Sequence, residues 1–245
     1  MQWQSWSRRL TDILGLGKAP VAVSYTDSAP EGASSGKCRA CSAVLRAAQG
    51  EVIDLTAETS ACPGGSQYLG ILPQDPAHAR ALREFLINGE KLFGSCVAIR
   101  RMTALTPAQP PLGMADHVVF SPLGKAQFRP DIAVFLVNAW QAARLVNLAV
   151  YETGVPMECD PSGSLCRAVV TYPLITSKVN VSFGDVTARR SERMSEHELF
   201  VTLPFTYLRS VVENLDRCTA GTAKPEIPPA MRRMIQESGA EPPEF

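Results

Sequence analysis

The sequence has no excess of charge of either sign. Its 24 basic residues are balanced by 24 acidic ones, so it offers no electrostatic footprint for nucleic acid or for an anionic membrane. It also lacks an apolar run as long as a membrane-spanning helix requires. We therefore expect neither a nucleic-acid partner nor a membrane partner.

Familiar catalytic motifs are missing as well. The chain has no Gly-x-Ser-x-Gly, no Walker A loop and no dinucleotide fingerprint. Its three histidines, His78, His117 and His197, do not have a metal-binding spacing such as His-Glu-x-x-His. The sequence therefore assigns no catalytic residue, and whether the protein is an enzyme stays open.

The N-terminal 18 residues predict an amphipathic surface helix, not a signal peptide, because charged residues interrupt the apolar ones. The apolar positions are Trp3, Trp6, Leu10, Ile13 and Leu14. We accordingly expect a reduced, cytoplasmic protein. In that compartment the seven cysteines would not form a disulfide framework, which leaves buried thiols, redox thiols or metal ligands.

The hydrophobic pattern predicts an α+β fold made of strand–helix–strand units. Strands are expected at residues 20–25, 52–56, 117–122, 130–137 and 167–172, and helices at 41–48, 77–88, 142–150 and 208–215. Ser195 and Glu198 are spaced as a capping box and predict one more helix, ended by Pro204.

A Pro-rich stretch at residues 107–113 reads as a hinge between two halves. We divide the chain into an N-terminal helix (1–19), a first half (20–106), a second half (107–217) and a tail (218–245). A short docking helix is possible in that tail, around Met231, Met234 and Ile235.

The two halves share several features in the same order, which indicates a degenerate duplication packed as one domain with an internal pseudo-two-fold. The helix at 41–48 matches that at 142–149, and a cysteine follows the helix-ending glycine at the same distance, Gly50 to Cys62 and Gly154 to Cys166. On this alignment Cys62 is equivalent to Cys166, and Cys96 to Asp185. Chance similarity of strand–helix–strand units is the alternative.

Cys62-Pro-Gly-Gly is the most specific local signal. Cysteine followed by proline is found among iron–sulfur ligands, and the backbone amides of Gly64 and Gly65 could approach and bond the sulfur. The alternative is a turn cysteine whose glycines serve only a positive φ.

Cys38-x-x-Cys41 at a helix start could be a redox dithiol, a metal ligand or a buried pair. A thioredoxin-like pair directly follows a strand, whereas a polar loop at 27–37 intervenes here, so we favour Cys41 as a ligand. Cys96 is expected in the core unless Asp185 marks the same position as an oxygen ligand. Cys159 and Cys218 have no counterpart that suggests a role.

Several of these blocks together resemble a family of archaeal and bacterial proteins known as domain of unknown function 169. The resemblance runs from about Pro20 to about Leu215. Its blocks are Pro20-Val-Ala-Val, Cys41 with Ala47-Ala-Gln-Gly50, Cys62-Pro-Gly-Gly-Ser-Gln-Tyr-Leu-Gly70, Pro130-Asp-Ile-Ala-Val-Phe, Gln141-Ala-Ala-Arg-Leu145 and Cys166.

The recurrent cysteines of that family imply a metal or iron–sulfur centre, with Cys41, Cys62 and Cys166 as matching positions. The family has a fourth cysteine in a Gly-Cys-x-Gly-x-Arg block, where this chain reads Phe183-Gly-Asp185-Val-Thr-Ala-Arg189. Either Asp185 supplies an oxygen, or another cysteine (Cys38, Cys96 or Cys159) substitutes, or one iron is left open.

We therefore predict a cytoplasmic iron–sulfur protein, with a [4Fe–4S] cluster as the first choice and a redox, sensing or substrate-binding role. Cys41, Cys62 and Cys166 would be ligands, with Asp185 or Cys96 as the fourth. Zinc is the alternative metal, but structural zinc favours close Cys-x-x-Cys pairs, and only Cys38 and Cys41 form one. The partner would be a redox protein or a small-molecule ligand.

Two metal-free classes remain. One is a thiol-dependent enzyme with Arg144 or Arg189 as anion binder, which requires a thiol of depressed pKa. The other is a small-molecule binding protein whose cysteines only fill the core.

Overall fold

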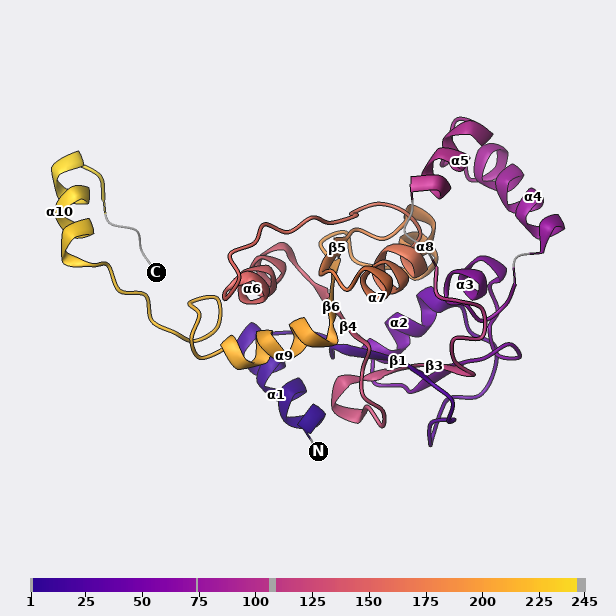
Figure 1. Ribbon diagram of the computed structural model, residues 1–245, viewed down its shortest axis with the longest axis horizontal. Coiled ribbons are helices and arrows are strands. Elements are labelled where there is room, and N and C mark those ends of the chain that lie inside the picture. Colours follow the sequence, from indigo (N-terminus) through magenta and orange to yellow (C-terminus); the bar gives the residue numbers. More distant parts are fainter. Residues whose placement is uncertain (1, 74, 106–108, 242–245) are drawn as a thin grey trace.

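A six-stranded antiparallel sheet in the order β2-β3-β1-β4-β6-β5 forms the centre of the molecule (Figure 1). The computed structural model describes residues 2–73, 75–105 and 109–241. The strands are β1 (Val21–Thr26), β2 (Ile53–Leu55), β3 (His117–Pro122), β4 (Ile132–Val137), β5 (Asn180–Ser182) and β6 (Leu199–Pro204). The predicted α+β class is confirmed.

Helices cover both faces of this sheet. The α-helices are α1 (Gln2–Leu14), α2 (Ala40–Ala48), α3 (Pro63–Tyr68), α4 (Pro76–Glu84), α5 (Cys96–Leu105), α6 (Ala139–Val150), α7 (Tyr172–Thr176), α8 (Val186–Ser191), α9 (Phe205–Asn214) and α10 (Pro229–Ser238). Two π-helical turns, η1 (Phe85–Gly89) and η3 (Cys166–Thr171), and a 3₁₀ turn, η2 (Leu123–Lys125), complete the described elements. No described helix is both long and apolar enough to cross a membrane.

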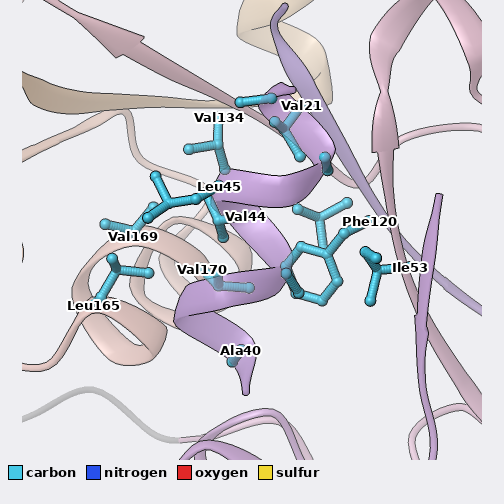
Figure 2. Close-up of a cluster of buried hydrophobic side chains, with 14 of the residues drawn as sticks. Val21, Ala40, Val44, Leu45, Ile53, Phe120, Val134, Leu165, Val169 and Val170 are labelled. Carbon is cyan, nitrogen blue, oxygen red and sulfur yellow. The ribbon is translucent and has the colours of Figure 1, made fainter. Parts of the chain in front are cut away.

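The sheet separates two hydrophobic cores, because alternate residues of each strand point to opposite faces. We call them the α2 face and the α9 face. On the α2 face, α2 and η3 cover Val21, Phe120 and Val134 (Figure 2). On the α9 face, α1, α6 and α9 cover Phe135 and Leu203. All six residues of β4 are therefore buried, which explains its continuous apolar run.

Two predicted elements are wrong. Residues 167–172 form η3 and the start of α7 rather than a strand. Their run of Ala, Val and Val is buried as part of a helical segment, and so short an apolar run does not distinguish helix from strand. Ser195 and Glu198 form a hydrogen-bonded turn rather than the start of a helix. The residues after this turn form strand β6, because they pair with both β4 and β5.

The predicted tail does contain a helix, α10, but none of its residues is buried. Within the described residues this helix is therefore not docked on the body, and the segment forms a tail that carries a helix. The predicted boundary between the halves, at residues 106 and 107, lies outside them.

The strand order reads the same from either edge when β1, β2 and β3 are exchanged for β4, β5 and β6. The register agrees, since Ala22 pairs with Ala133 at the centre, and β3 and β6 both end in proline opposite the first residue of β1 or β4. However, α2 packs on the α2 face and α6 on the α9 face, so the predicted equivalence of these helices is wrong. The internal two-fold itself stays a hypothesis.

Phe120 tests the core of the α2 face. Its side chain is fully buried, so Phe120→Ala is expected to lower the free energy of unfolding by about 3–5 kcal/mol through lost burial and the cavity left behind. Phe85→Ala is the control, because that side chain is 52% exposed and should change stability little. Urea denaturation measures both, and equal losses would contradict the assignment of the core.

Candidate thiolate site

The structure brings Cys41, Cys62 and Cys166 together on the α2 face. Cys41 lies in the first turn of α2, Cys62 is the N-cap of α3, and Cys166 begins η3. The short helix α3 packs against both α2 and η3. Cys41 and Cys166 also pack against one buried cluster, so the three cysteines lie in one region of this face.

Cys62 is held by the helix that it caps. Pro63 occupies the first turn of α3, and the Gly65 N–H donates to Cys62 Sγ at 3.3 Å. Neither Gly64 nor Gly65 has a positive φ, so the alternative explanation of these glycines as left-handed turn residues is wrong. Gly65 instead permits close contact between α3 and α2, because a Cβ at residue 65 would lie 3.4 Å from Ala40 Cβ of α2.

Cys41 contacts a carboxylate that the sequence did not reveal. Glu192 Oε1 accepts from Arg39 Nη2 at 2.6 Å, from Ser42 Oγ at 2.7 Å and from Cys41 Sγ at 3.7 Å. Glu192 is separated from Cys41 by 151 positions and belongs to no recognisable motif, so only the folded chain identifies it. It is a carboxylate in direct contact with one of the three thiols.

Asp185 lies near Cys166, but both of its oxygens already have partners. Its Oδ1 accepts from the Ala188 N–H at 2.6 Å as the N-cap of α8, and its Oδ2 accepts from the Leu165 N–H at 2.9 Å. The carboxylate thus joins the start of α8 to the residue before Cys166. Its role as a fourth ligand stays a prediction, and its observed role is structural.

The symmetric strand order, in which β1, β2 and β3 correspond to β4, β5 and β6, also changes which residues correspond. Helix α2 lies between β1 and β2 in the chain, η3 lies between β4 and β5, and both pack on the α2 face, which relates Cys41 to Cys166. Cys62 and Asp185 are then related as the N-caps of α3 and α8. The predicted equivalence of Cys62 with Cys166 and of Cys96 with Asp185 is not the one that this topology supports.

Three other candidate residues are not brought to the thiols. Cys96 is exposed at the start of α5, on the α4–α5 arm that projects from the body in Figure 1, so the expectation that it belongs to the core is wrong. Arg144 lies on the α6 helix of the other face and donates to the Ala220 and Gly221 carbonyls. Arg189 donates to the carbonyls of Phe183, Ser195 and Glu198.

Of the remaining cysteines, Cys38 lies on the α2 face, in the buried cluster against which Cys41 and Cys166 pack. Cys38 is buried, Cys218 is buried on the α9 face, and Cys159 is exposed. Among the described residues, no three or more His, Cys, Asp or Glu side chains are grouped tightly enough to hold a single metal ion.

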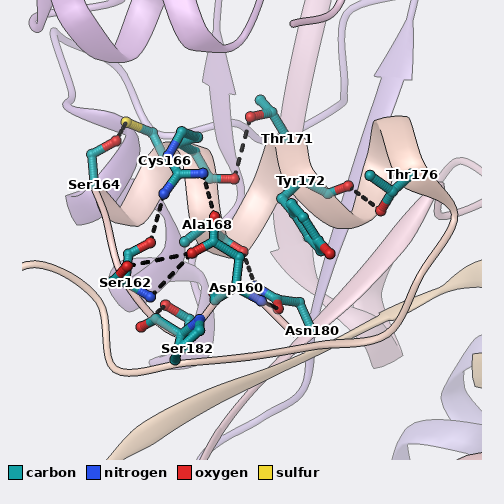
Figure 3. A network of polar contacts seen from close by, with 12 residues as sticks. Asp160, Ser162, Ser164, Cys166, Ala168, Thr171, Tyr172, Thr176, Asn180 and Ser182 are labelled. Carbon is teal, nitrogen blue, oxygen red and sulfur yellow. Dashed lines mark hydrogen bonds and ion pairs between the residues drawn. The ribbon is translucent and has the colours of Figure 1, made fainter. Parts of the chain in front are cut away.

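A buried polar network fixes the chain around Cys166 (Figure 3). The Arg167 side chain is only 4% exposed, pairs with Asp160 Oδ2 at 2.5 Å and donates to the Ser162 carbonyl at 2.6 Å. Gly163 has a φ of +107° and lies directly against this guanidinium, so no side chain fits there. Asn180 of β5 adds a bond to the Ala168 carbonyl at 2.6 Å.

Burial keeps the thiols of Cys41 and Cys166 protonated in the metal-free protein. Burial, followed by the nearby Glu192 carboxylate, raises the pKa of Cys41 to about 11. Burial also raises the pKa of Cys166 to about 12. Burial also raises the pKa of Cys38. A thiol nucleophile needs the opposite shift, so these three cysteines do not match the thiol-dependent enzyme considered from the sequence.

The network at Arg167 gives a stability prediction. Asp160→Ala leaves a buried guanidinium without its carboxylate and is expected to cost about 3–5 kcal/mol of unfolding free energy. Asp216→Ala removes the carboxylate of the exposed Arg9 pair and should cost less than about 1 kcal/mol. Chemical denaturation compares the two, and similar small losses would contradict a structural role of the network.

The raised thiol pKa values give a pH prediction for the reduced, metal-free protein. Their stabilising contribution is complete below the unfolded-state pKa of about 8.5 and is lost as the pH rises toward the folded values of about 11 and 12. The free energy of unfolding should therefore fall from about pH 8.5 upward. The double variant Cys41→Ala, Cys166→Ala should show a shallower fall in urea titrations, and an unchanged slope would refute the assignment.

Comparison with known proteins agrees with the sequence resemblance. The family model DUF169, described as an uncharacterised ArCR family, matches residues 9–214. A relative from Methanocaldococcus jannaschii, called uncharacterized protein MJ0308, is 24% identical over 218 residues, which cover 86% of this chain and 92% of the relative. No solved structure gives a match. Because the family model covers most of its length, the chain belongs to the DUF169 family.

Proposed function

We propose that this chain is an iron–sulfur protein in which Cys41, Cys62 and Cys166 hold one cluster, with [4Fe–4S] as the first candidate. One observation carries the proposal: three cysteines from separate segments meet on one face of the sheet. Single core cysteines have no reason to converge in this way, whereas thiolate ligands of one centre must.

The sequence separation of the cysteines favours a cluster over a zinc ion. Structural zinc usually takes close Cys-x-x-Cys pairs, and only Cys38 and Cys41 form one in this chain. Three thiolates would leave one iron of a [4Fe–4S] cluster without a cysteine, and that iron would supply an open position or a labile, sensing centre.

The surrounding chain suits bound thiolates. The Gly65 N–H already donates to Cys62 Sγ, and amide hydrogen bonds to sulfur stabilise the ionised form. Because Cys41 and Cys166 are protonated in the metal-free protein, loading must release their protons, and loading should therefore improve as the pH rises. Asp185 is occupied as a helix cap and Cys96 is remote, so neither is needed in this arrangement.

Glu192 accepts a hydrogen bond from Cys41 and is a candidate oxygen ligand for the fourth iron while no small molecule occupies it. Its pairing with Arg39 balances its charge beside a thiolate at Cys41. We propose a cytoplasmic protein in which the open position takes a small-molecule ligand or the cluster exchanges electrons with a redox partner.

A metal-free binding protein is the second candidate. Cys41 and Cys166 both pack against the buried apolar cluster of the α2 face, as core cysteines would. This alternative predicts that replacing either thiol costs only the stability of an ordinary core truncation and removes no chromophore.

Anaerobic purification followed by an absorption spectrum and iron and sulfide analysis separates the two candidates. We expect a brown protein, and loss of most of the iron and sulfide in Cys41→Ser, Cys62→Ser and Cys166→Ser, because each removes one ligand. Cys96→Ser and Cys159→Ser are the controls, since both thiols are exposed. A colourless protein without iron or sulfide would refute the cluster, and zinc at one equivalent would favour the other metal.

A further inference from the structure

Helix α10 presents its apolar side chains to solvent. Met231 and Met234 are 55% and 68% exposed, and no residue of the helix is buried. Met231, Met234 and Ile235 are spaced at i, i+3 and i+4, so they form one stripe along the helix, which we call the Met231 stripe. A stripe of this kind is the side on which a helix normally packs against another surface.

The sequence specifies both ends of α10, although the helix is short. Pro229 lies in its first turn, and Gly239, with a φ of +69°, ends it. A helix of 10 residues is marginal in water by itself, because most helical stability in proteins comes from the packing of an apolar face. The Met231 stripe therefore requires a surface to cover it.

A hollow with exposed aromatic side chains lies at the start of α6. It has a volume of about 500 Å³, and both Trp140 and Phe183 line it. Trp140 is 70% exposed and Phe183 is 57% exposed. Adjoining apolar side chains that are this exposed indicate a surface that binds a partner. We call this surface the Trp140 hollow.

The Trp140 hollow also carries a negative charge that is free to pair. Glu196 lines it with a side chain that is 87% exposed, and its carboxylate lies 3.6 Å from the exposed His197. Glu198, a second carboxylate of the hollow, is already paired with Lys18 at 2.5 Å. Glu196 is therefore the carboxylate that a basic partner would meet.

The Met231 stripe and the Trp140 hollow are complementary in chemistry. Methionine adapts its shape to a surface, and its sulfur makes favourable contacts with aromatic rings. Arg232 lies beside the stripe, since successive residues of a helix are rotated by about 100°. Its Nε donates to the Ile227 carbonyl at 3.1 Å, so its terminal nitrogens are the groups that can pair with Glu196.

The linker of α10 favours a second molecule over the helix's own body. Residues 223–228 form no helix or strand, and they include Pro225 and Pro228. Proline makes a linker extended and semi-rigid. Helix α10 accordingly stands apart from the sheet and from the helices that cover it (Figure 1). A helix held outward by such a spacer is placed to reach a neighbouring molecule.

We propose that α10 of one molecule docks its Met231 stripe in the Trp140 hollow of a second copy of this chain. When each molecule does this to the other, the two contacts are identical and close a symmetric dimer by exchange of helices. The proposal is independent of the cluster, because neither α10 nor the hollow includes one of the three thiols.

Analytical ultracentrifugation of the full chain over a range of concentrations tests the proposal. We expect a monomer–dimer equilibrium that is weakened at least about tenfold by Trp140→Ala and by the double variant Met231→Ser, Met234→Ser, because each removes one side of the contact. Phe85→Ala is the control, since that exposed aromatic lies on the α4–α5 arm. All these side chains are exposed, so circular dichroism should show folded variants.

Mixing the two variants tests whether the contact runs between molecules. The Trp140→Ala chain keeps an intact α10, and the Met231→Ser, Met234→Ser chain keeps an intact hollow. A mixture should therefore form heterodimers through one intact contact, at concentrations at which either variant alone is monomeric. A mixture that associates no better than the separate variants would overturn the exchange of helices.

A charge reversal tests the pairing of Arg232 with Glu196. Glu196→Arg places two positive charges together and should weaken the dimer, and adding Arg232→Glu should restore much of its affinity. The absence of rescue would overturn this pairing. A wild type that is monomeric at every concentration would overturn the second copy as the occupant. A dimer that Trp140→Ala weakens no more than Phe85→Ala does would overturn the Trp140 hollow as the docking surface.

Discussion

The candidate site depends on the packing of α2 and η3 over the central strands of the sheet. Val44 of α2 and Val169 and Val170 of η3 belong to one buried cluster with Val21, Phe120 and Val134 (Figure 2). This packing brings together segments that are more than a hundred residues apart. Because Cys41 and Cys166 begin these two segments, the burial that stabilises the fold also sets the position of the thiols.

Polar interactions around this core limit how far the site can move. The ion pair between Arg167 and Asp160 holds the loop before η3 (Figure 3). Asp185 joins the residue before Cys166 to α8. A site on such supported elements is more exactly placed than one on free loops. Burial of Cys41 and Cys166 would have a cost for the proposed function, since a metal would have to displace their protons before it could bind.

Much of the fold could be predicted from the sequence. β1, β3, β4, α2, α6 and α9 follow from apolar periodicity, and both cores depend on them. The segment at 167–172 could not be assigned, because a short β-branched run fits a buried helix as well as a strand. β6 was missed because pairing with β4 and β5 overrides the helix signal of Ser195 and Glu198.

The site was predictable in part. The cysteines at 41, 62 and 166 were chosen for their spacing and their local motifs, and tertiary packing brings these three together. Glu192 could not be found in this way, because it contacts Cys41 from a segment that is distant in the sequence. Arg144 and Arg189 were predicted as anion binders, but both donate to backbone carbonyls.

Anomalous X-ray scattering at the iron edge, from crystals of the anaerobically purified protein, tests the central claim most directly. The account predicts one strong iron peak on the α2 face, bonded by the sulfurs of Cys41, Cys62 and Cys166. An iron peak elsewhere, or well-ordered crystals in which these three sulfurs are unbound, would contradict it.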